Sequence, residues 1–175
     1  RKIYQSLLEW KNQKEKMCLV VKGARQVGKT FIINKFAQEN YENYIYMNFD
    51  ENPGYKAIFD GDLDVENLIK QISLRVPNVN LIPYKTIIFL DEIQNCPNAR
   101  TALKFLALDK RFDVIASGSL LGINYREVES FPVGYTEQIE MHSLDFEEFL
   151  WANGVTSQSI LDIKGYFNKK EVVPS

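Results

Sequence analysis

A chain of 175 residues, 45% hydrophobic and 25% charged, has the size and composition of one globular domain that buries a sizeable core. Its formal net charge of −2 provides no bulk field to attract nucleic acid, so nucleic-acid binding stays open but unsupported. No apolar run approaches the ~20 residues of a membrane-spanning helix and no secretory signal opens the chain, so we expect a cytoplasmic protein without membrane contact.

The first elements in chain order are two helices, each followed by a strand. Apolar residues at helical spacing over 1–17 predict an amphipathic helix. The continuous apolar run 17–22 predicts a strand buried on both faces of a parallel sheet. Helical spacing returns over 30–40, with Asn40 as the stop, and the aromatic and β-branched run 44–49 predicts a second strand.

The middle of the chain continues the same alternation. Asp64 is a suitable N-cap for a helix over about 65–74. An apolar strand follows within 85–94 and meets two acids where its apolar part ends. A helix over 98–110 leads to an apolar strand over 112–119 that ends in small polar residues.

The last elements are less regular. Weak alternation over 134–141 is consistent with an outer strand. Asp145 followed three residues later by Glu148 forms a capping-box pattern, which predicts a helix that stops at Gly154. We expect one domain over 1–160, with 161–175 as the start of a further element or a disordered tail.

Strands that alternate with helices predict an α/β protein with a mainly parallel sheet and helices on both faces, a three-layer αβα sandwich.

The octapeptide GARQVGKT, Gly23 to Thr30, fits the pattern G-x-x-x-x-G-K-[ST] of a phosphate-binding loop, or Walker A motif. The alternative is a glycine-rich turn with a surface lysine, but the pattern arises by chance in about one per cent or fewer of chains this long.

Each residue type in this loop suits phosphate. Gly23 and Gly28 permit backbone angles and close approaches that a Cβ would forbid. The loop amides would then point at an anion near the positive end of the following helix. Lys29 supplies a charge for the β- and γ-phosphates, and the Thr30 hydroxyl is a ligand for Mg²⁺. The residues expected to contact a bound nucleotide are Gly23, Ala24, Arg25, Gln26, Val27, Gly28, Lys29, Thr30 and Phe31.

Two acids are expected to complete the site. Asp91 ends an apolar run and would hold Mg²⁺ from the carboxyl end of its strand, the Walker B role. Glu92 would activate the water that attacks the γ-phosphate, so Glu92 and Lys29 are the expected catalytic residues. For the acidic pair, the alternative is a polar strand end that caps the next turn.

Ser117 and Ser119 are candidates for a sensor of the γ-phosphate, and small residues that ease a tight turn are the alternative.

Arginines often neutralise the transition state of phosphoryl transfer, in cis or from a neighbouring subunit. Arg25, Arg100 and Arg126 are the candidates, and a solvated surface arginine is the alternative for each. His142 is the only histidine, which excludes a metal site built from several histidines. Tyr46, like the other aromatic residues around it, is interpreted as a core and strand residue rather than as a platform for a base.

Several blocks of sequence together resemble one family. In order they include LLEWK, GARQVGKT, NFDENP, IIFLDEIQNCPNA, SGSLLG and FPVGYTEQIEMHSLDFEEFL. They are similar to a bacterial and archaeal group of AAA-type ATPases, usually described simply as ATP-binding proteins, over roughly residues 1–155. The chain departs from the usual pattern at Tyr135, His142 and Ser143, which puts in doubt any role for a basic residue at position 135 but not the nucleotide site.

The resemblance implies a P-loop NTPase of the additional-strand, AAA-like class, with ATP and Mg²⁺ as cofactors. It also implies an attached C-terminal domain with a restriction-nuclease-like appearance, and it leaves a homo-oligomer open. The leading hypothesis is a Mg²⁺-dependent ATPase, slow in isolation, that drives a conformational change in that domain. A nucleotide-gated switch with negligible turnover is the main alternative, and a small-molecule kinase is a remote one.

Overall fold

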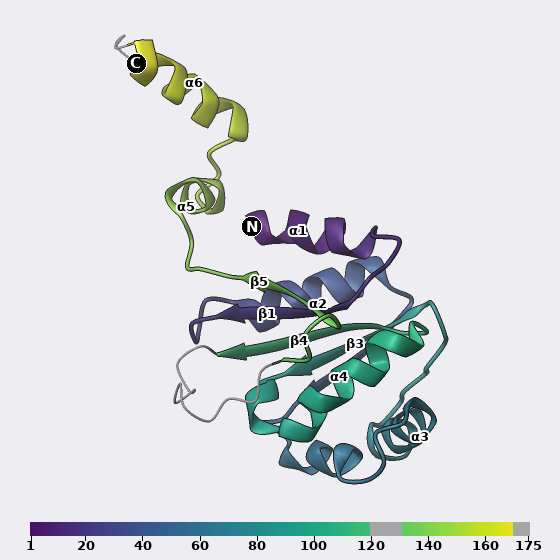
Figure 1. Cartoon of the computed structure of the whole chain (residues 1–175). Coiled ribbons are helices and arrows are strands. Elements are labelled where there is room, and N and C mark those ends of the chain that lie inside the picture. The colour runs from purple at the N-terminus through teal and green to yellow at the C-terminus, as the bar shows by residue number, and fades with distance from the viewer. Residues whose placement is uncertain (120–130, 170–175) are drawn as a thin grey trace.

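The computed structural model describes residues 1–119 and 131–169 of the chain. Its centre is a five-stranded sheet with parallel neighbours in the order β2-β3-β4-β1-β5 (Figure 1). The strands are β1 (Cys18–Gly23), β2 (Asn43–Asn48), β3 (Thr86–Asp91), β4 (Asp113–Ser119) and β5 (Thr136–Glu140). The sheet is parallel because the segments between strands return the chain to the same edge before each new strand begins.

The α-helices are α1 (Lys2–Lys11), α2 (Lys29–Asn40), α3 (Val65–Arg75), α4 (Pro97–Asp109), α5 (Phe146–Ala152) and α6 (Ser157–Lys169). Short 3₁₀ segments η1 (Pro53–Phe59) and η2 (Ile93–Asn95) follow β2 and β3. Within the described residues, none of these helices has both the length and the apolar character required to traverse a bilayer. The division of the chain at residue 160 stays a prediction.

Helices cover both faces of the sheet, and each face has its own hydrophobic core. Residues of β3 alternate between the two cores, as a strand's period of two requires. Ile88 and Leu90 belong to the core that α3 and α4 cover, while Ile87 and Phe89 belong to the core that α1 and α2 cover. Every residue of β3 is buried, as expected for a strand with neighbours and helices on all sides. The predicted three-layer αβα fold is therefore confirmed.

The structure differs from the prediction at two places. Helix α1 ends at Lys11 rather than near residue 17, because the chain turns back: the buried Trp10 side chain donates to the carbonyl oxygen of Met17 at 2.9 Å. The 3₁₀ segments η1 and η2 are both absent from the predicted elements. The weak alternation over 134–141 is confirmed as a strand, β5.

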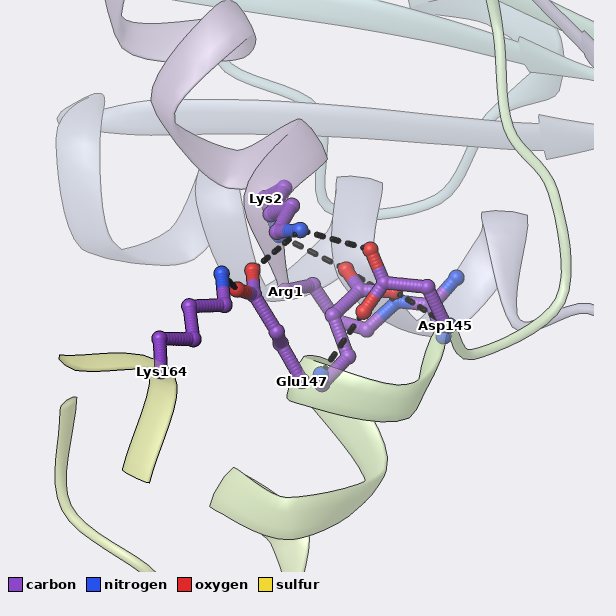
Figure 2. A network of polar contacts seen from close by, with 6 residues as sticks. Arg1, Lys2, Asp145, Glu147 and Lys164 are labelled. Atoms are coloured by element: carbon purple, nitrogen blue, oxygen red, sulfur yellow. Dashed lines mark hydrogen bonds and ion pairs between the residues drawn. The ribbon is translucent and has the colours of Figure 1, made fainter. Parts of the chain in front are cut away.

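Polar contacts attach α5 to the N-terminus of α1 (Figure 2). The predicted capping box is present: Asp145 accepts from the Glu148 amide at 2.8 Å, and Glu148 accepts from the Asp145 amide at 3.2 Å. The Lys2 ammonium lies 2.6 Å from a carboxylate oxygen of Asp145 and 2.6 Å from one of Glu147. Lys164 of α6 also pairs with Glu147, so one carboxylate links three helices (Figure 2).

Candidate functional site

The polar residues singled out by the sequence lie at one edge of the sheet, where the parallel strands end. Gly23 at the end of β1 is level with Ser119 at the end of β4. Asn48 at the end of β2 is level with Asp91 at the end of β3. The carboxyl edge of an open parallel sheet is where α/β proteins collect ligands, so the candidate site is built there.

The loop between β1 and α2 depends on its two glycines for different reasons. Gly28 has φ 91°, a left-handed conformation that residues with a Cβ rarely adopt. Gly23 instead permits a close approach, because a Cβ at this position would lie 2.2 Å from the carbonyl oxygen of Met141. The Met141 amide donates to the carbonyl oxygen of Lys22 at 2.7 Å, which holds the two segments together. Gln26 is also left-handed, with φ 64°.

Lys29 begins α2 and folds back over the loop. Its ammonium donates to the carbonyl oxygens of Gly23 at 3.0 Å and Ala24 at 2.7 Å. Burial lowers the pKa of Lys29, the neighbouring carboxylates oppose this, and the positive charge of Arg25 adds to the lowering. The loop therefore combines a partly desolvated cation with the amides of a helix N-terminus, a combination suited to an anion.

Asp91 is buried and accepts hydrogen bonds from three side chains and one amide. Thr30 donates from its hydroxyl to Oδ2 at 2.7 Å, and Tyr46 donates to the same oxygen at 3.2 Å. Ser117 and the Glu92 amide, the latter at 3.0 Å, donate to Oδ1. The structure thus brings the two predicted magnesium ligands, Thr30 and Asp91, into direct contact.

These oxygens are of the kind that Mg²⁺ prefers. No group of three His, Cys, Asp or Glu side chains within residues 1–119 and 131–169 could hold a metal ion. A magnesium ion at Thr30 and Asp91 would therefore complete its coordination with water and with oxygens of a bound nucleotide, which is its usual habit beside phosphates.

Glu92 directly follows β3 in a left-handed conformation, with φ 53° and ψ 45°. Its side chain is half-buried and accepts a hydrogen bond from the side-chain amide of Gln94. The two sensor candidates differ: Ser117 bonds to Asp91, whereas the buried Ser119 hydroxyl has no hydrogen-bond partner in the described part of the chain.

The arginine candidates lie in different surroundings. Arg25 is exposed on the loop, next to the Lys29 ammonium whose pKa it helps to lower. Arg100, near the start of α4, has its guanidinium 5.5 Å from the ring centre of Phe131. Arg126 lies outside the described residues. Of the two that the structure describes, Arg25 is the one that lies on the loop.

Tyr46 has a polar contact that the sequence interpretation missed. It does pack in the sheet, with its ring centre 5.3 Å from that of Phe89. Its hydroxyl also reaches Asp91, and Asn48 donates to that hydroxyl at 3.1 Å. Burial raises the pKa of Tyr46 to about 12, so the phenol keeps its proton and donates at neutral pH. The sequence does contain a signal for this contact: Tyr46 and Asn48 are two positions apart, which places both side chains on the same face of a strand.

An open pocket of about 690 Å³ adjoins the loop. Its lining includes loop residues 25–28 and continues onto Phe31, Met141 and Leu144. Phe31 is 72% exposed although it belongs to α2, so the pocket presents an apolar wall to the solvent. No local sequence pattern reveals this pocket, because it joins the loop to the segment after β5.

Comparison with known proteins supports the fold and the family. The sequence profile of a family described as "AAA domain" matches residues 15–150. A Haemophilus influenzae protein named "Uncharacterized protein" is 28% identical over 153 residues, which are 84% of this chain and 36% of that protein. The chain thus spans about a third of the length of this relative.

Two solved structures align with most of this chain. A structure of Caenorhabditis elegans PCH-2 has a TM-score of 0.51 at 14% identity and covers 99% of this chain, which corresponds to 48% of that one. The Aeropyrum pernix ORC1 protein, solved in complex with DNA, has a TM-score of 0.48 at 15% identity and covers 88% of this chain and 47% of that one. At such low identity, the match to PCH-2 supports the fold alone.

Proposed function

The chain belongs to the AAA-domain family, and from this premise we propose that it binds ATP with Mg²⁺ and hydrolyses it. Family membership supports nucleotide binding and an ATPase-type function. One observation carries the proposal further: the Thr30 hydroxyl lies 2.7 Å from the Asp91 carboxylate, where the phosphate-binding loop meets the end of β3. This is the relationship that a magnesium ion beside bound phosphates requires.

The phosphates would lie against the loop 23–30. In this arrangement the amides at the start of α2 donate to phosphate oxygens, and phosphate oxygens replace the carbonyl groups that Lys29 contacts now. Mg²⁺ held by Thr30 and Asp91 supplies charge neutralisation for the β- and γ-phosphates. The apolar pocket beside Phe31 and Leu144 is suited to the base, because it adjoins the same loop.

Hydrolysis would use Glu92 as the general base. A water oxygen forms a bond to the γ-phosphorus while the bond from that phosphorus to the bridging oxygen breaks, and ADP leaves. Glu92 accepts a proton from the attacking water. Ser117 and Ser119 stand on the neighbouring strand, and the Ser119 hydroxyl, which has no hydrogen-bond partner within residues 1–119 and 131–169, would donate to a phosphate oxygen.

In longer proteins of this family, we expect turnover to drive a conformational change in an attached C-terminal domain. The length of the Haemophilus influenzae relative, of which this chain matches 36%, is compatible with such a domain. An arginine finger would come from Arg25 or from a second subunit.

Phosphate release with ATP and Mg²⁺ tests the proposal. Glu92→Gln is expected to lower kcat by about 10²- to 10⁴-fold, the usual contribution of a general base, while ATP still binds. Glu15→Gln, an exposed acid ahead of β1, is the matched control and should keep wild-type turnover. Equal turnover in wild type and Glu92→Gln would remove Glu92 as the base. Tight binding without any wild-type turnover would favour the nucleotide-gated switch.

A further inference from the structure

The backbone around Glu92 is held by its own short turn. The Glu92 amide donates to Asp91 at 3.0 Å, and its carbonyl oxygen accepts from the Asn95 amide at 3.0 Å. Ile93, the next residue, is 1% exposed and anchors η2 in the core. The backbone therefore fixes the direction in which the Glu92 side chain leaves the end of β3. The position of the carboxylate still depends on the rotatable bonds of the side chain.

Gln94 removes part of this remaining freedom. Its side-chain nitrogen donates to Oε2 of Glu92, which leaves Oε1 of the same carboxylate without this contact. The other end of the amide, Oε1 of Gln94, is buried and has no hydrogen-bond partner in the residues the structure describes. A buried unpaired amide oxygen is unfavourable and uncommon in folded proteins, so its presence at this position calls for a reason other than stability.

Gly118 provides the room that the Gln94 amide occupies. A Cβ at position 118 would lie 2.8 Å from Oε1 of Gln94. Gly118 stands on β4 between the two sensor candidates, Ser117 and Ser119. The backbone of Gly118 is not in the left-handed region that favours glycine. The reason for a residue without a Cβ at this position is therefore the close approach of the Gln94 side chain.

We propose that Gln94 is a positioning residue for Glu92, an inference that rests on the hydrolysis proposed above. The Gln94 amide holds one carboxylate oxygen, so the other is presented to the attacking water. Gln94 and Glu92 belong to one turn, 92–95, which the bond from the Asn95 amide to the Glu92 carbonyl oxygen closes, so the hydrogen bond orients the carboxylate within that turn. Gly118 acts through Gln94, because it leaves space for the amide.

Two variants test this proposal: one changes Gln94 itself, and the other changes the glycine that leaves space for it. Gln94→Met keeps the volume of the side chain, removes the donor and also removes an oxygen that has no partner among the described residues, so its melting temperature should not fall. Gly118→Ala leaves both residues of the pair intact but displaces the Gln94 amide. Each should lower kcat roughly 10- to 100-fold, since misplacement of a reacting group by about 1 Å costs that much. KM and the dissociation constant of ADP should stay within about twofold of wild type. Gln158→Met on the exposed surface of α6 is the matched control.

A double-mutant cycle with Glu92→Gln decides whether Gln94 acts through Glu92. In the Glu92→Gln background, Gln94→Met should cause no further loss of kcat. If Gln94→Met lowers kcat by a similar factor in the Glu92→Gln background, the inference is overturned. It is also overturned if Glu92→Gln is inactive while the single variant Gln94→Met keeps the kcat of wild type. If wild type and every variant lack turnover, the proposed hydrolysis fails and this inference fails with it.

Discussion

The Thr30 hydroxyl lies 2.7 Å from the Asp91 carboxylate, although 61 positions separate the two residues in the chain. Thr30 lies in α2, which follows β1, and Asp91 ends β3; β4 lies between these two strands, and Ser117 of β4 bonds to the same carboxylate. The loop 24–28 connects β1 to α2 and places the start of the helix, with Thr30, beside Asp91. The contact is thus a product of the strand order, and it is the feature from which the proposed magnesium site is argued.

Nucleotide affinity should fall as the pH rises, because of Lys29. Burial lowers its pKa from the ordinary value of 10.5, and the ammonium form is the one that attracts phosphate. Raising the pH through that lowered pKa deprotonates Lys29 and weakens binding, whereas below it the affinity should no longer depend on this group. Dissociation constants of a fluorescent ATP analogue from about pH 7 to about pH 10 measure the effect.

The controls for this titration are two lysines of the same helix. Lys29→Met should bind weakly at every pH and lose the dependence, while Lys35→Met, on the exposed side of α2, should retain it. The same slope in Lys29→Met as in wild type would assign the pH dependence to another group.

Gly23→Ala should disturb the loop more than an average glycine substitution. The new Cβ would lie 2.2 Å from the carbonyl oxygen of Met141, so either the loop or the end of β5 must move. We expect a loss of about 1–3 kcal/mol in the free energy of unfolding, as for other overpacked sites, together with weaker nucleotide binding. Gly165→Ala in α6, where a Cβ meets nothing within 4 Å, is the control and should not lower stability. Denaturant unfolding that shows equal effects at the two positions would contradict the close approach.

Glu148→Ala should weaken the attachment of α5 to α1. Glu148 is 7% exposed, accepts from the main-chain amide of Lys2 at 2.7 Å and closes the capping box with Asp145. Loss of a cap together with a buried hydrogen bond should cost about 1–2 kcal/mol of unfolding free energy. Glu147→Ala removes only exposed ion pairs with Lys2 and Lys164 and should cost less. Chemical denaturation of both variants measures the difference, and a larger loss for Glu147→Ala would reverse the assignment.

Much of the fold follows from local patterns in the sequence, because apolar runs, helical spacing and a capping box are local signals. The phosphate-binding loop and the two acids at the end of β3 are equally local signals, and the edge at which they meet follows from a parallel sheet. The end of α1 was predicted too late, because the contact between Trp10 and Met17 is made by the chain turning back on itself.

The rest of the site depends on non-local geometry. Tyr46 reaches Asp91 only because β2 pairs with β3 in one register and α2 covers the face on which both side chains lie. The contact of Gln94 with Glu92 depends on a left-handed turn that the letters D-E-I-Q do not specify. The close approach of Met141 to Gly23 depends on β5 pairing with β1, two strands that are distant in sequence.

Isothermal titration of ATP with and without Mg²⁺ tests the proposed site most directly. In wild type, Mg²⁺ should raise the affinity by at least about tenfold, and Asp91→Asn should lose that gain while it keeps the magnesium-free affinity. Asp50→Asn, an exposed acid after β2, is the matched control and should keep the gain. An undiminished magnesium effect in Asp91→Asn, or no ATP binding by the wild type, would contradict a nucleotide site built on Thr30 and Asp91.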